Sequence, residues 1–152
     1  MNVSELLVAR REAILDRATE SLSRAHLPSY EAVGADRSRA RLEKLFDLAT
    51  EAIERRNLTE LLRYVEGIAQ GRFEAGFTLP EVQTAFNVLE EAIWSTVVAE
   101  TPPIGLGEAF GLVGTTLGAG KDRLAATYVE LASQAKAPSL DLRALFNGTA
   151  AG

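Results

Sequence analysis

The chain of 152 residues has no cysteine and only one histidine. Because a thiol is missing, disulfide bridges, thiolate metal sites and thiol catalysis are all excluded. The single histidine, His26, ends a helical segment just before Pro28, and the sequence assigns it no serine or aspartate partner. A di-metal site in a helical bundle would also need paired Glu-x-x-His motifs. We therefore expect no catalytic residue, no metal site and no cofactor, and predict that the chain is not an enzyme.

An excess of basic residues and a long apolar run are missing as well. There are 16 basic and 21 acidic residues, which gives a net charge of −5. Charge therefore does not draw the chain to nucleic acid or to anionic lipid. No apolar run approaches the ~20 residues that a membrane span needs, and Arg10 and Arg11 come too early for a signal-peptide core. We expect a cytoplasmic protein that binds neither nucleic acid nor membrane.

Apolar residues recur at helical spacing along almost the whole chain, and no segment alternates as a strand would. The pattern predicts an all-α fold, a single-domain bundle of about five to six helices, the first of them capped by Ser4. Residues 1–136 form the predicted helical domain, and residues 137–152 form a C-terminal arm or mobile tail. The expected helices cover roughly residues 4–25, 36–56, 57–76, 78–101 and 105–136.

The segment 71–94 carries the clearest local signals. Gly76 is well placed to end one helix in the left-handed conformation. Thr78 and Glu81 have the spacing of a capping box that begins the next helix, which runs to the only tryptophan, Trp94. A connection of about three residues between two helices predicts a hairpin or a sharp corner.

The last predicted helix has an unusual number of glycines in its interior. Each of them costs ~1 kcal/mol of helix stability relative to alanine. Four fall on one stripe, which favours a close contact with another helix, either within the chain or across a homodimer: Gly107, Gly111, Gly114 and Gly118. Beside the stripe, a four-three spacing predicts a buried seam of Leu106, Phe110, Val113, Leu117, Leu124, Tyr128 and Leu131.

Aromatic side chains offer the only candidate ligand pocket. Such a set more often belongs to the core than to a ligand cage. The alternative to a core role is an apolar pocket between helices, lined by Phe73, Phe77, Phe86, Trp94 and Phe110.

One stretch resembles a known family. Gly71-Arg-Phe-Glu-Ala-Gly-Phe-Thr-Leu-Pro-Glu-Val82, followed by Leu89 to Trp94, is similar to the N-terminal sensor domain of RsbR-type co-antagonists of the stressosome. The similarity extends to the helix order over roughly residues 4–135. It implies a globin-like helical fold without haem.

The resemblance also implies a non-catalytic signal-input or adaptor domain in bacterial stress or regulatory signalling. Such a domain acts through dimerisation and contacts with signalling proteins, and no residue of the shared motif is catalytic. The family usually continues into a phosphorylatable output domain, so we expect either a stand-alone homologue or an output partner on another polypeptide. The alternative function is the binding of an apolar small molecule between helices.

Overall fold

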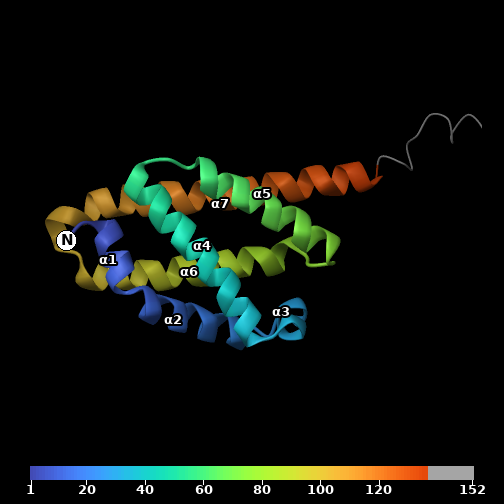
Figure 1. Ribbon diagram of the computed structural model, residues 1–152, viewed down its shortest axis with the longest axis horizontal. Helices are drawn as coiled ribbons and strands as arrows, with labels where there is room; N and C mark the ends of the chain where they lie inside the picture. The colour runs from blue at the N-terminus through green and yellow to red at the C-terminus, as the bar shows by residue number, and fades with distance from the viewer. Residues whose placement is uncertain (137–152) are drawn as a thin grey trace, which may run out of the picture.

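The computed structural model describes residues 1–136, so the predicted arm or tail at 137–152 lies outside the described residues. The described chain is all-α, with seven helices and no strand (Figure 1). This confirms the predicted class and a single domain, and it is consistent with a globin-like arrangement. The helices are α1 (Val3–Ala9), α2 (Arg11–Arg24), α3 (Pro28–Val33), α4 (Ala35–Arg55), α5 (Thr59–Glu74), α6 (Leu79–Glu100) and α7 (Pro103–Lys136).

The N-terminal region contains the helices that the apolar pattern missed. The predicted first helix is divided into α1 and α2 at Arg10, whose φ of −108° and ψ of 14° leave the helical range. Ser4 is not the cap, because Asn2 forms a capping box with Glu5 and the Ser4 hydroxyl donates to the Asn2 side chain. Pro28 begins α3 instead of only ending the preceding helix, since the first turn of a helix does not need its missing N–H.

The corner between α5 and α6 has the predicted geometry. Gly76 has a φ of 85°, in the left-handed region. Thr78 accepts a hydrogen bond from the Glu81 backbone N–H, and the Glu81 carboxylate accepts one from the Thr78 backbone. The predicted capping box is therefore confirmed.

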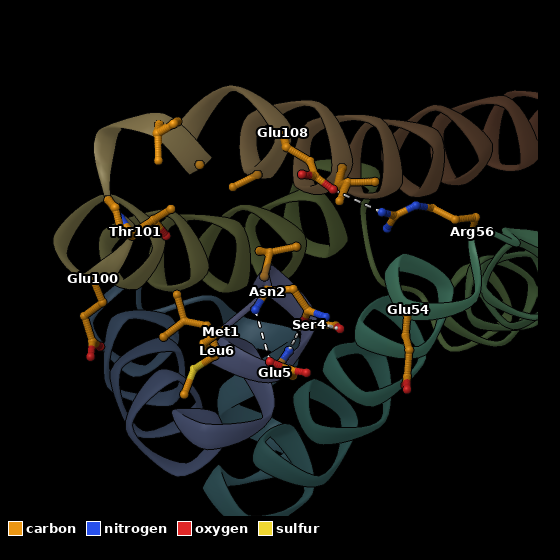
Figure 2. Close-up of a pocket in the computed structure, with 16 residues that line it drawn as sticks. Met1, Asn2, Ser4, Glu5, Leu6, Glu54, Arg56, Glu100, Thr101 and Glu108 are labelled. Carbon is orange, nitrogen blue, oxygen red and sulfur yellow. Dashed lines mark hydrogen bonds and ion pairs between the residues drawn. The ribbon is translucent and has the colours of Figure 1, made fainter.

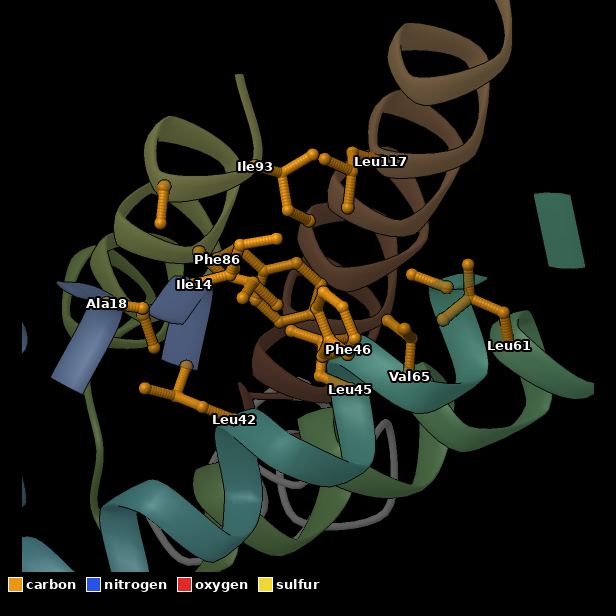
Figure 3. Packing of buried hydrophobic residues seen from close by; sticks show 14 of the residues in the cluster. Ile14, Ala18, Leu42, Leu45, Phe46, Leu61, Val65, Phe86, Ile93 and Leu117 are labelled. Atoms are coloured by element: carbon orange, nitrogen blue, oxygen red, sulfur yellow. The ribbon is translucent and has the colours of Figure 1, made fainter. Parts of the chain in front are cut away.

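A single apolar core lies between α2, α4, α5, α6 and α7 (Figure 3). Phe46 of α4 is its largest fully buried side chain, with 1% of its surface exposed. Ile14, Val65 and Ile93 bring residues of three other helices to the same core. Leu7 of α1 and Tyr30 of α3 belong to the same cluster, so burial of apolar surface from all seven described helices supplies the main driving force for this arrangement.

The two longest helices, α6 and α7, follow each other through a short turn and run side by side in opposite directions (Figure 1). The inner stripe of α7 includes Val113, Leu117, Leu124 and Tyr128 of the predicted seam. Phe110 was expected in that seam as well, but 45% of its surface is exposed because it lies at the edge of the stripe. Within residues 1–136, no helix is both long and apolar enough to cross a membrane.

Candidate functional site

The glycine stripe of α7 faces away from the rest of the chain. A Cβ atom built at Gly107, Gly111, Gly114 or Gly118 would meet no heavy atom of the described chain within 4 Å, apart from the backbone of its own helix. No other helix therefore approaches these glycines closely, and the tight crossing within the chain is absent at these positions. The contact between two copies, which was the other expectation, stays a prediction.

Apolar side chains border the stripe. The rings of Trp94 and Phe110 pack together with centroids 4.9 Å apart. Val98 lies one turn beyond Trp94 on α6 and is 56% exposed, and Ile104 at the start of α7 is 98% exposed. We define the α6–α7 face as Trp94, Val98, Ile104, Phe110 and the four stripe glycines.

The α6–α7 face carries little charge, whereas α2 and α4 carry many ion pairs. Glu108 is the single charged residue between positions 103 and 120. By contrast, Arg39 of α4 lies within 3.2 Å of the carboxylates of Glu12, Asp16 and Glu43. Exposed ion pairs keep a surface hydrated, so the uncharged α6–α7 face is the easier one to remove from water.

The aromatic residues predicted to line a pocket lie in three places. Phe86 is buried in the core, and Trp94 and Phe110 form the surface pair. Phe73 packs edge-on against Tyr128, and Phe77 packs edge-on against Tyr30. The sequence did not predict that Tyr128 packs against Phe73 or that Tyr30 packs against Phe77, because neither tyrosine is close to its phenylalanine in the chain.

A groove of about 610 Å³ lies between the N-terminal residues, the end of α4 and the α6–α7 turn (Figure 2). Three of the charged residues that line it form ion pairs: Arg56, Glu100 and Glu108. Arg56 contacts Glu108 at 3.3 Å, and Arg10 binds Glu100 at 2.6 Å. The hydrogen bond from Arg10 lowers the pKa of Glu100 below its ordinary value. Because these charged groups are paired with one another, they are not free to bind a charged ligand in the groove.

The only histidine of the chain, His26, lies at the protein surface. His26 is 80% exposed at its side chain and contacts Glu31 at 3.0 Å through Nδ1. In the described part of the chain, no group of three or more histidine, cysteine or acidic side chains is arranged to hold a metal ion. The α6–α7 face presents exposed apolar side chains with little charge beside them.

The family model described as the RsbT co-antagonist protein rsbRD N-terminal domain matches residues 12–140. Neither the search of curated proteins nor the search of solved structures found a significant match. The matched range runs from the second residue of α2 through α7 and therefore includes the whole α6–α7 face.

Proposed function

Because the chain belongs to the family of RsbT co-antagonist protein rsbRD N-terminal domains, we propose that it is a non-catalytic signal-input domain in stress signalling that works as a homodimer. The family is one of regulatory signalling domains. The proposed dimer joins the α6–α7 faces of two copies and presents the outer surfaces to signalling proteins.

The glycine stripe carries this proposal. Four interior glycines weaken α7 by ~1 kcal/mol each, and no packing within the described chain offsets that cost. Close contact with a second copy supplies a compensation, because helices without side chains at the crossing can bring their backbones together. The pair Trp94 and Phe110 beside the stripe supplies the large apolar side chains that stabilise protein interfaces.

A second copy fits the face better than a charged partner does. The surface from 103 to 120 has one carboxylate and no basic residue, so an acidic or basic partner would find few ion pairs there. An identical face matches it in polarity, as a two-fold interface requires. In this dimer, the ion-paired surfaces of α2 and α4 remain available to partners of other kinds.

Substitution of Gly114 by leucine tests the dimer. The new side chain extends into space that is empty in a single chain, so the monomer should fold and gain helix propensity. In the dimer it fills the crossing, and we expect the dissociation constant to rise at least about tenfold, an effect of ~1.4 kcal/mol. Sedimentation equilibrium across micromolar concentrations measures this change.

Gly67→Leu is the matched control. Gly67 is also an exposed glycine inside a helix with nothing within 4 Å of its Cβ position, but it lies on α5. This variant should dimerise like the natural sequence. A natural chain that stays monomeric at all concentrations tested, or equal weakening by both substitutions, would contradict the proposal.

A further inference from the structure

A group of basic side chains on α4 and α5 has no ion-pair partner in the part of the chain that the structure describes. Three of them follow one stripe of α4, because Arg37, Arg41 and Lys44 are four and then three positions apart. The last one, Arg72, belongs to the final turn of α5. We call these four residues the basic patch. Arg37 and Lys44 are exposed, whereas Arg41 and Arg72 are half-buried.

The other arginine and lysine side chains behave differently. Within residues 1–135, each of those outside the basic patch forms an ion pair with a carboxylate: Arg10, Arg11, Arg17, Arg24, Arg39, Arg55, Arg56, Arg63, Lys121 and Arg123. The chain as a whole has a net charge of −5, so carboxylates are in excess. Unpaired arginine and lysine side chains are nevertheless gathered in one place in this range.

Nearby acidic residues do not neutralise the basic patch. Two acidic residues of α4 point their carboxylates at α2 and at its partner arginine, since Asp47 pairs with Arg11 and Glu43 pairs with Arg39. Glu81 is used as well, because it accepts hydrogen bonds from the capping box and from α3. The positive charge of the patch is therefore left to an external partner.

An aromatic ring holds the two half-buried arginines in place. Their guanidinium carbons lie over the ring of Phe77, 5.8 Å from its centre for Arg41 and 5.6 Å for Arg72. Tyr30 packs edge-on against the same ring at 5.1 Å. A side chain that is already fixed loses little conformational entropy when a partner binds it. This pair of cations is therefore preorganised for an anionic group.

The cations of the basic patch repel one another. Burial lowers the pKa of Arg41 below its ordinary value, and the charges of Arg72 and Arg37 lower it further. Arg41 and Arg72 also line one small cavity, and no carboxylate is among the residues around it. A carboxylate beside these guanidinium groups would favour their charged form and offset the repulsion.

Hydrogen bonding in the patch is incomplete as well. Nη1 of Arg41 and Nε of Arg72 have no hydrogen-bond partner in the described chain. Elsewhere on α4, Arg39 donates to three carboxylates, those of Glu12, Asp16 and Glu43. The two arginines of the patch are thus less well satisfied than an arginine of the same helix that faces α2.

From this charge distribution we infer that the basic patch is the docking surface for an acidic segment of a partner protein, with carboxylates at close spacing. Seven positions of α4 separate Arg37 from Lys44, which corresponds to about 10 Å along the helix axis. Side chains at alternate positions of an extended peptide lie about 7 Å apart on one face. Two or three carboxylates of one short peptide therefore reach the whole stripe.

The surface around the patch favours a short acidic peptide over a nucleic acid or an anionic membrane. The carboxylates of Glu12, Asp16 and Glu43 surround Arg39 on the neighbouring side of α4. A long polyanion or a lipid surface would extend beyond four cations and be repelled by a chain with a net charge of −5. Binding to nucleic acid also depends on neutralising several phosphates along a track.

The basic patch goes beyond the proposed homodimer and does not depend on it. One chain supplies all four residues, and they lie on α4 and α5, whereas the proposed contact between two copies uses α6 and α7. The variant Gly114→Leu should therefore bind an acidic peptide as the natural chain does. Failure of the dimer would leave this docking surface intact.

Titration of the full chain with the peptide Glu-Ser-Glu-Ser-Glu-Ser tests the docking surface, followed by nuclear magnetic resonance. At physiological ionic strength, charges more than about 8 Å from the peptide are largely screened. The Nε–H signals of Arg41 and Arg72 should shift, and that of Arg63, an exposed arginine paired with Glu60, should not. The same peptide with glutamine in place of glutamate should bind at least about tenfold more weakly.

Reversal of the two exposed charges, Arg37→Glu together with Lys44→Glu, should raise the dissociation constant for the glutamate peptide at least about tenfold. Both side chains are exposed, so this variant should fold. Arg24→Glu together with Arg63→Glu is the matched control. It changes the net charge by the same amount at two exposed arginines of α2 and α5, and it should weaken binding less than about twofold.

Three results would overturn the inference. One is the absence of binding by the glutamate peptide, or equal binding by the glutamine peptide. Another is equal weakening by the two charge-reversal variants, which would show that net charge alone attracts the peptide. The third is tighter binding of a single-stranded oligodeoxynucleotide, or of vesicles that contain phosphatidylserine, when that binding is lost in the variant at Arg37 and Lys44. The patch would then serve a nucleic acid or a membrane instead of a protein.

Discussion

Gly120 is the glycine of α7 that lies against two other helices. A Cβ atom there would be 3.6 Å from the Phe86 ring and 3.9 Å from Val65, which are ordinary contact distances. The stripe glycines, such as Gly114, have open space at the same position. All of these residues look alike in the sequence, because only the packing of α7 against α5 and α6 decides which glycine is covered.

Gly120→Ala should stabilise the domain. The added methyl group fits at contact distance and removes the entropy cost of a glycine inside a helix. We expect a gain of about 0.5–1 kcal/mol in the free energy of unfolding, measured by urea denaturation. Gly120→Leu is the comparison, since overpacking should destabilise by about 1–3 kcal/mol. A less stable alanine variant would show that this part of the core has no room for a methyl group.

Among the helices, α3 and α6 are joined through one side chain. Glu81 of the α6 capping box is 9% exposed. Its carboxylate accepts from the Ser29 backbone N–H at 3.0 Å and from the Ser29 hydroxyl at 2.9 Å, as well as from Thr78. The capping box is visible in the sequence, whereas the bond to Ser29, 52 positions away, is not.

This link predicts a pH dependence. The hydrogen bonds of Thr78 and Ser29 hold the pKa of Glu81 below its ordinary value of 4.5. Its stabilising effect is therefore complete above pH 4.5 and is lost as the pH falls through the lowered pKa. Glu81→Gln should cost about 2 kcal/mol at pH 7, and the difference from the natural chain should shrink below pH 4.5. Urea denaturation at several pH values measures this difference in the free energy of unfolding. A difference that does not vary with pH would contradict the stabilising role given to the Glu81 carboxylate.

For the whole molecule, the decisive feature is an asymmetry of the surface. Exposed ion pairs cover α2 and α4, including Arg11 with Asp47 at 2.9 Å and Arg39 with Asp16 at 2.7 Å. The α6–α7 face instead exposes glycines beside Trp94 and Phe110. Burial of that face in a dimer is the step on which the proposed function depends.

Dimerisation should make thermal stability depend on concentration. A second copy that binds only the folded chain stabilises it by mass action. The melting temperature of the natural chain should therefore rise with protein concentration, and that of Gly114→Leu should begin to rise only at concentrations at least about tenfold higher. Calorimetry at several concentrations tests this, and a natural chain whose melting temperature is constant would argue against the dimer.

Much of the secondary structure could be predicted from short stretches of sequence. The all-α class, the left-handed Gly76 and the capping box of Thr78 and Glu81 depend on apolar spacing and on residues within four positions of one another. The break at Arg10 could not be predicted, since no proline or glycine marks it. The exposure of Phe110 also escaped prediction, because it depends on how α7 is rotated against its neighbours.

The candidate sites divide in the same way. The sequence by itself determined that the chain lacks cysteine chemistry, that α7 carries a row of glycines and that one stretch resembles the rsbRD family. Only the tertiary structure decided that this row faces outward and that Arg41 and Arg72 line one cavity without a carboxylate. The reason is physical: composition and helical periodicity are local properties, whereas burial and the loss of hydrogen-bond partners depend on which helices meet.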